Sequence, residues 1–169
     1  MPDPVALDGE SVSGQPPSAG PAGANPEQGL PPELVRVLDV FSRLGREQTM
    51  QALVDYANRF PELPDRFAAL AASEEHKVHE CMTPVALFSE VDDGRIRFYA
   101  DVPRNAPTIR ALLAILMQGL NGRPVEDVLA IPSDFVSKLM RNVGLSTRER
   151  GLQAILARMK RHAREALAA

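Results

Sequence analysis

Residues 84–102, PVALFSEVDDGRIRFYADV, carry the pattern of a β-hairpin in a chain whose other segments mostly show helical spacing. Residues 84–91 are rich in strand-forming side chains. In residues 95–102 the apolar side chains recur at every second position and would share one face, namely Ile96, Phe98, Ala100 and Val102. Asp93-Gly94 between the two runs is a strong signal for a tight turn. The stretch therefore predicts two antiparallel strands.

Helical patterns lie on both sides of this hairpin. Pro31-Pro32 suits the start of a first helix, and the prolines of residues 60–64 end a second one. After the hairpin, residues 106–120 are apolar on most sides, with Asn105 as the expected cap. Ser146 and Glu149 match a capping box for a final helix. We predict an α+β fold with helices packed around a small antiparallel sheet.

Composition separates the first residues from the rest. Residues 1–30 are rich in Pro, Gly and Ala, carry four acids and no Lys or Arg, and are expected to be a disordered tail. Residues 31–169 are expected to form a single domain. No apolar run approaches the roughly 20 residues of a membrane span, and no signal peptide is evident. A net charge of -3 argues against general binding of nucleic acid.

The chain has one cysteine, Cys81, in the segment Val78–Val85. A lone cysteine cannot close an intramolecular disulfide or alone hold a metal cluster, and its use fits a reducing, cytoplasmic location. If Cys81 does chemistry, that chemistry is nucleophilic, because a thiolate can attack a group, carry it and hand it on. A buried, inert side chain is an equally good interpretation of the pattern alone.

His79 lies two residues before Cys81 in the sequence. His76, His79 and Cys81 together match no standard zinc spacing, so a metal site is not expected. His79 could favour the thiolate form of Cys81 or shuttle a proton, or it could be a solvated loop residue.

The last helix is markedly basic, with Arg148, Arg150, Arg158, Lys160, Arg161 and Arg164 against two acids. Arg148 falls in its predicted first turn, where the helix dipole disfavours a cation, so Arg148 could serve a thiolate or a partner acid. An ordinary exposed arginine is the alternative. The basic face as a whole could be a partner surface, a nucleic-acid surface or solvated, and nucleic acid is the weakest of these without interleaved aromatic residues.

Several patterns, taken in order, resemble the SufE family of sulfur-acceptor proteins. The break at Phe60–Pro64 is similar to the leucine–proline–glutamate–leucine stretch of the family. The spacing of Val78, Cys81, Thr83 and Val85 resembles its cysteine loop. Residues 106–120 are similar to its central helix, and Leu145–Leu152 to the start of its last helix. The similarity spans roughly residues 30–163.

This resemblance implies a SufE/IscU-like α+β domain over residues 31–169 and a particular chemistry. Cys81 would accept sulfane sulfur from a pyridoxal-phosphate-dependent cysteine desulfurase, a SufS-like partner, and stimulate that enzyme. It would then pass the sulfur to an iron–sulfur scaffold complex, a SufB-like partner. Arg148 would help to position the cysteine loop and the partner. The chain would need no cofactor of its own, because the partner cleaves the carbon–sulfur bond.

Four positions depart from the pattern of the family. Glu80 replaces a glycine before the cysteine, Thr83 a serine, Ala86 a tryptophan and Asn105 an acidic cap. The acceptor cysteine is unaffected, although a carboxylate at Glu80 should disfavour a neighbouring thiolate.

The resemblance and the residues together lead to one hypothesis and two alternatives. The hypothesis is a persulfide carrier and desulfurase activator, a sulfurtransferase-type protein rather than a stand-alone enzyme, and a monomer. One alternative is an iron–sulfur scaffold, which typically uses several cysteines. The other is a non-catalytic helical adaptor in which Cys81 is inert.

Overall fold

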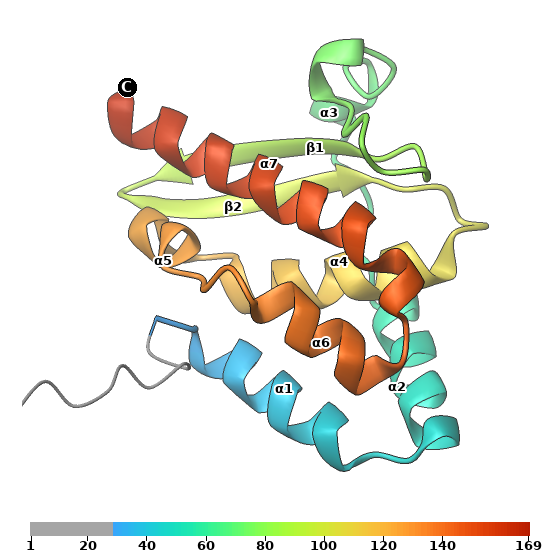
Figure 1. Cartoon of the computed structure of the whole chain (residues 1–169). Helices are drawn as coiled ribbons and strands as arrows, with labels where there is room; N and C mark the ends of the chain where they lie inside the picture. Colours follow the sequence, from blue (N-terminus) through green and yellow to red (C-terminus); the bar gives the residue numbers. More distant parts are fainter. Residues whose placement is uncertain (1–28) are drawn as a thin grey trace, which may run out of the picture.

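The computed structural model describes residues 29–169. The predicted tail, residues 1–30, lies almost entirely outside the described residues. The fold is shown in Figure 1.

The predicted hairpin is confirmed. Strand β1 (Ala86–Asp92) pairs antiparallel with β2 (Arg95–Asp101), joined by a turn at Asp93 and Gly94. Both turn residues have positive φ, 49° and 71°, which an Asp-Gly pair adopts at low cost and which matches the twist of the strands. A short third strand, β3 (Arg123–Pro124), pairs with β2 and gives the sheet order β1-β2-β3. No pattern in the sequence predicted β3.

Helix α4 (Pro107–Leu120) is the centre of the core. Apart from Gln118, the side chains from Ala111 to Leu120 are buried, as the apolar pattern predicted. The helix contacts α1, α2, α7 and β2. A Cβ at Gly119 would lie 2.5 Å from Cδ2 of Leu34, so the glycine allows α1 to approach α4 closely. The sheet and the remaining helices are therefore organised around one apolar helix.

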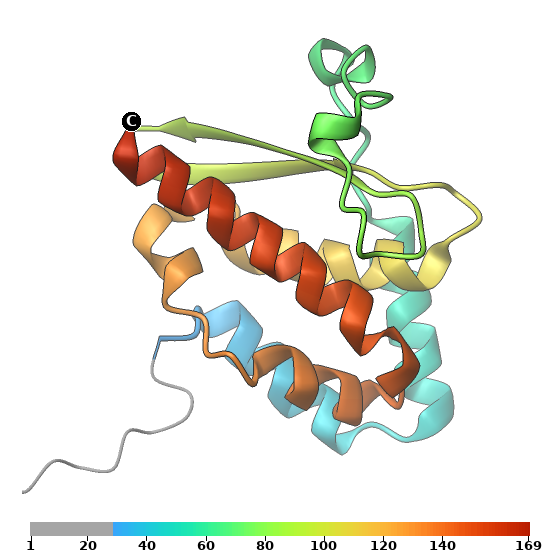
Figure 2. The same cartoon turned by 45° about the horizontal axis from the view of Figure 1, so that its top comes forward.

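The remaining elements surround α4. They are α1 (Pro32–Arg43), α2 (Arg46–Asn58), α3 (Asp65–Ala68), the 3₁₀ turn η1 (Glu74–His76), α5 (Val125–Leu129), α6 (Phe135–Val143), the 3₁₀ turn η2 (Ser146–Arg148) and α7 (Glu149–Ala168). Figures 1 and 2 show the hairpin on one side of α4, α1 and α6 on the other, and the long α7 crossing between them. This arrangement confirms the α+β prediction.

Two predicted helix caps are wrong. The residue before α4 is Ala106, and no side chain caps the helix, so Asn105 lies one residue too early. Ser146 and Glu149 do not form a capping box either. The chain makes a 3₁₀ turn over Ser146–Arg148 first, and the Glu149 carboxylate accepts a hydrogen bond from Ser137 on α6. Arg148 therefore ends that turn, immediately before α7.

Helix α7 is joined to the sheet by a histidine. Nδ1 of the half-buried His162 lies 2.8 Å from Oγ of Ser89 on β1, within hydrogen-bond distance. Burial lowers the pKa of His162 below its ordinary value of 6.5. The carboxylate of Glu165 opposes this shift, and the nearby Arg158 and Arg161 act in the same direction as burial. The folded protein thus holds this imidazole in its neutral form at a pH where the unfolded chain already binds a proton.

A pH-dependent loss of stability follows from that lowered pKa. The contribution of His162 is complete above pH 6.5 and is lost as the pH falls through the lower pKa of the folded state. We expect His162→Gln, which does not titrate, to lose less stability than the wild type between about pH 7.5 and about pH 5.5. Urea unfolding of both proteins at each pH measures the difference. Equal losses in the two proteins would contradict the assignment.

Candidate functional site

Cys81 lies in a loop between η1 and β1. The loop is closed at its base by a hydrogen bond from the Val78 N–H to the Val85 carbonyl, 2.9 Å, next to a single β-bridge between Lys77 and Ala86. Strand-like pairing in residues 77–79 is limited to this bridge and the adjacent hydrogen bond. Inside the loop, the Cys81 N–H donates to the Val78 carbonyl at 3.2 Å. The cysteine is thus outside any helix or strand, on a short segment with few hydrogen bonds of its own.

The thiol faces inward. Cys81 is 8% exposed, whereas its neighbour Met82 is 97% exposed. A cavity of about 120 Å³ lies beside the thiol, between the loop, α4 and the start of α7. Its lining consists of Glu80, Cys81, Met82, Thr83, Ile109, Thr147, Arg148, Arg150 and Gly151. Figure 2 shows the green loop that precedes β1 descending beside the first part of α4 and the N-terminal half of α7.

Gly151 provides the surface against which the thiol packs. A Cβ at this position would lie 3.3 Å from Sγ of Cys81 and 4.0 Å from its Cα. That first distance is closer than an ordinary carbon–sulfur contact, so a side chain here would press on the thiol. The absence of a side chain at Gly151 therefore leaves room for Cys81 to pack against α7.

Arg148 joins the thiol cavity to a second, larger hollow. It lines the cavity with Cys81 and also a hollow of about 490 Å³ beside Pro84 and the start of α4. Asn105, the departure at the expected cap, lines this second hollow. The structure thus brings Cys81 and Arg148 to one site, as expected, and adds Arg150 from the next turn.

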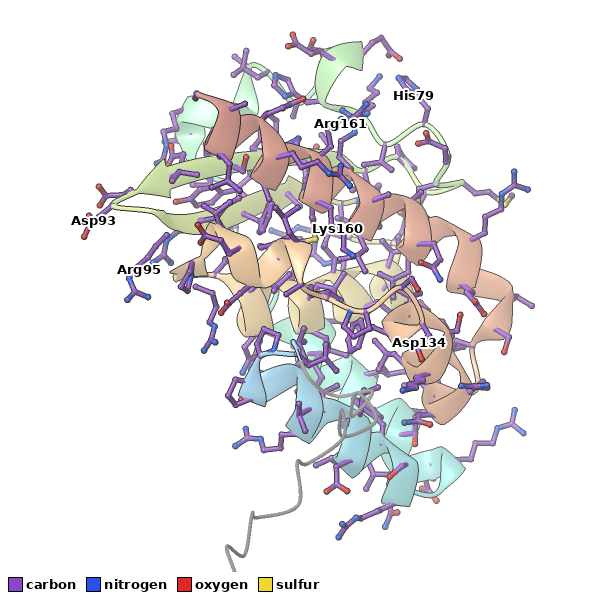
Figure 3. All side chains as sticks on the ribbon, turned by 60° about the vertical axis from the view of Figure 1, so that its left-hand side comes forward. His79, Asp93, Arg95, Asp134, Lys160 and Arg161 are labelled. Carbon is purple, nitrogen blue, oxygen red and sulfur yellow. The ribbon has the colours of Figure 1, made fainter. Side chains whose placement is uncertain are left out.

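His79 is not part of that lining. Its side chain is 60% exposed, and its Nδ1 lies 3.7 Å from a carboxylate oxygen of Glu74. Figure 3 shows His79 directed outward, away from the body of the fold. The Glu74 carboxylate is held mainly by a hydrogen bond from Lys77, which lowers the pKa of Glu74. The structure therefore does not bring the imidazole into the cavity beside Cys81.

Arg158 is a site residue that the sequence did not single out. From α7, its guanidinium donates to the carbonyl of Lys77 at 2.7 Å and to that of Glu75 at 3.1 Å. Charge-assisted hydrogen bonds of this kind are among the stronger ones. Arg158 thus fixes the segment before the cysteine loop to α7. No sequence pattern distinguished it from the other arginines of that helix.

Between residues 29 and 169, no three or more His, Cys, Asp and Glu side chains are grouped so that they could hold a metal ion. None of the helices in the same range combines the length and apolar character needed to cross a membrane.

The geometry defines a class of protein: a small α+β domain that presents one loop cysteine to a cavity lined by arginines. The chain belongs to the SufE family. The family model described as "SufE: Fe-S metabolism associated domain" matches residues 36–163, which links the chain to iron–sulfur metabolism. The predictions of family and fold class are confirmed.

Relatives from several organisms support this assignment. The chain is 37% identical over 139 residues to an uncharacterized SufE-like protein of Mycobacterium tuberculosis, covering 81% of this chain and 95% of the relative. It is 29% identical over 155 residues to SufE-like protein 1, chloroplastic/mitochondrial, of Arabidopsis thaliana, covering 90% of this chain and 40% of that one. The solution structure of a hypothetical protein from Thermus thermophilus superposes with a TM-score of 0.68 at 36% identity. That match covers 83% of this chain and 99% of the other.

Proposed function

We propose that this protein is a persulfide carrier of iron–sulfur cluster assembly. Cys81 accepts sulfane sulfur from a pyridoxal-phosphate-dependent cysteine desulfurase, which the protein stimulates, and passes it to an iron–sulfur scaffold complex. We further propose that it acts in the cytoplasm as a monomer. The observation that supports the proposal best is the position of the only thiol, in a loop and beside a cavity that two arginines line.

The transfer is a thiol–disulfide-type exchange. The thiolate of Cys81 attacks the terminal sulfur of the persulfide on the partner's cysteine. The sulfur–sulfur bond in the partner breaks, a new one forms on Cys81, and the partner's cysteine leaves as a thiolate. No electrons are gained or lost overall, so the step needs no oxidant or reductant. In the delivery step the roles are reversed: a thiolate of the next acceptor attacks the terminal sulfur on Cys81, and Cys81 leaves as a thiolate.

The cavity suits the product of that exchange. Its volume of about 120 Å³ exceeds what one additional sulfur atom needs. Two arginines, Arg148 and Arg150, share its lining with one acidic residue, Glu80. Cations near a persulfide stabilise its negative charge, so the pair of arginines offsets the unfavourable effect expected of Glu80. Ile109 and Gly151 contribute an apolar wall that limits access of competing small thiols.

Transfer also requires that the thiol leave the cavity. Cys81 is mostly buried, so another protein's active site cannot reach it unless the loop moves. The loop lies outside regular structure, and its internal hydrogen bonds are few. Meanwhile Arg158 holds the segment before the loop on α7. An outward movement can therefore be confined to the few residues around Cys81 and leave the fold unchanged.

Intact mass spectrometry tests the proposal. The protein is mixed with cysteine and the cysteine desulfurase encoded in the same genome, and its mass is measured without reductant. We expect a gain of one sulfur atom, located on Cys81 by peptide analysis and absent when the desulfurase is omitted. A protein that gains no sulfur while the desulfurase turns over would refute the carrier function.

A further inference from the structure

The basic residues of α7 fall into two groups. Lys160 donates to the carbonyl of Ile131 at 2.6 Å, and Arg158 donates to the carbonyls near the cysteine loop, so both are used inside the fold. Arg150, Arg161 and Arg164 are exposed and take part in none of the ion pairs found within residues 29–169. The three arginines of the second group therefore carry positive charge that no ion pair within residues 29–169 neutralises.

These three arginines lie along one line on the helix. We use the term arginine stripe for the five residues Arg150, Ala154, Ala157, Arg161 and Arg164. Their spacing of four, three, four and three residues places them on one face of an α-helix. The stripe has arginines at both ends and small side chains in the middle.

A shallow hollow follows the middle of the arginine stripe. It has a volume of about 510 Å³ and is lined by Glu80, Gln153, Ala154, Ala157, Arg158, Arg161 and Arg164. Glu80 also lines the thiol cavity, as does Arg150 at the start of the stripe. In Figure 3, Lys160 lies on the side of α7 toward α5, whereas Arg161 lies toward the segment that carries His79. The stripe therefore leads directly to the cysteine loop.

Arginines of the stripe lower the pKa of two neighbouring side chains on α7. Arg164 helps to lower the pKa of Lys160, and Arg161 helps to lower that of His162, in both cases in addition to burial. Anions brought to this face would relieve repulsion that the fold leaves in place.

We propose that the arginine stripe is the docking site for an acidic, amphipathic helix of the cysteine desulfurase. The inference rests on the proposed function and adds the surface and the chemistry by which the partner is recognised. Ala154 and Ala157 let a second helix approach closely, at the 8–10 Å separation typical of packed helices. Acidic side chains of that helix pair with the arginines at the two ends. A partner held there has its reactive cysteine brought beside the loop of Cys81.

The composition of the stripe favours a helix over other anionic partners. Single-stranded nucleic acid is bound through aromatic side chains on which bases stack, and the stripe has none. A membrane-binding helix pairs its basic face with large apolar side chains, whereas the middle of the stripe is alanine. Arginines at both ends with small residues between them instead suit a packed helix whose acidic side chains complement that charge.

Binding of the desulfurase to charge-reversal variants tests this docking site. Arg161→Glu/Arg164→Glu is compared with Arg36→Glu/Arg46→Glu, which makes the same change in net charge on α1 and α2. Because like charges across an interface are strongly unfavourable, we expect the first variant to raise Kd about tenfold or more and the second to leave it nearly unchanged. Added salt should weaken wild-type binding and have less effect on the stripe variant.

A neutral variant tests the close approach of a helix. Ala157→Gln changes no charge but fills the hollow, and we expect it to raise Kd about threefold or more because it holds the two backbones apart. Sulfur gain on Cys81 at saturating desulfurase should persist in every variant, which separates docking from chemistry. If the wild type binds no desulfurase, both proposals fail. If the wild type gains sulfur but Arg161→Glu/Arg164→Glu binds as tightly, the stripe alone is refuted.

The same proteins are also tested against single-stranded RNA and anionic phospholipid vesicles. We expect neither to bind wild type at the salt concentration where the desulfurase does. Tight binding of either probe, together with no effect of Ala157→Gln on desulfurase binding, would mean a general anion surface and would overturn the helix-docking proposal.

Discussion

Replacing Cys81 with serine is expected to abolish sulfur acceptance and to return desulfurase turnover to the rate of the enzyme alone. A serine hydroxyl is a weak nucleophile at neutral pH, and it cannot form a persulfide. The substitution removes no carbon atoms and places a slightly smaller oxygen against Gly151, so the loop keeps its packing. Sulfide release by the desulfurase in the presence of cysteine and a reductant measures the effect.

Binding provides the control for this prediction. Because Cys81 lies in the cavity and not on the arginine stripe, Cys81→Ser should bind the desulfurase with nearly the wild-type Kd. Loss of stimulation with binding retained assigns the effect to the sulfur atom. If Cys81→Ser stimulates the desulfurase as well as wild type does, the protein is an adaptor that acts by docking alone, which is the interpretation in which the cysteine is inert.

The sequence was most informative where local chemistry and tertiary structure agree. The Asp93-Gly94 turn needs two residues of positive φ, and few other pairs adopt them so easily, so the turn and the two antiparallel strands that it joins could be predicted. The helix of residues 107–120 was predicted as buried because its apolar residues cover nearly every side. In both cases one stretch of sequence contains all the information that the prediction needs.

Predictions failed where the structure depends on hydrogen bonds to residues that are distant in the sequence. Glu149 was expected to cap its own helix, but Ser137, twelve residues earlier, donates to its carboxylate. Strand β3 has only Arg123 and Pro124 and forms because Gly122 and Val125 also bond to the backbone of the hairpin. Neither partner can be identified from spacing along the chain.

Some residues of the candidate site could be found from the sequence, and others only from the structure. Cys81 was found because it is the only cysteine, and Arg148 because the resemblance to the family included it. His79 was proposed because it is close in sequence, yet its ring points outward to Glu74. Gly151 contacts Cys81, and Arg158 contacts the segment before the cysteine loop, each across about seventy to eighty residues of chain, so only the structure reveals them.

Replacing Gly151 with leucine is expected to expose the thiol of Cys81. The new side chain would occupy the space of Sγ and of the cavity, and the loop is the part of the site that can yield. Overpacking a filled site typically costs about 1–3 kcal/mol. A shift of that size in the equilibrium between the inward and outward positions of the thiol corresponds to about fivefold to about 150-fold in population. Alkylation of Cys81 by iodoacetamide should accelerate accordingly.

The same variant tests whether the cavity protects the sulfur after Cys81 has accepted it. A persulfide on Cys81 of Gly151→Leu should lose its outer sulfur to dithiothreitol faster than on wild type, because the cavity no longer covers it. Gly151→Ala, whose single Cβ demands an adjustment of only a few tenths of an ångström, should fall between the two.

Ala157→Leu, on the exposed side of the same helix, is the matched control and should alkylate at the wild-type rate. Circular dichroism and urea unfolding check that each variant is folded, and a glycine removed from a helix interior should not by itself reduce helix stability. If a folded Gly151→Leu protein alkylates no faster than wild type, the thiol is not held against α7 in solution. The cavity would then have no part in protecting the sulfur, and the carrier would have to shelter its cargo by remaining bound to its partner.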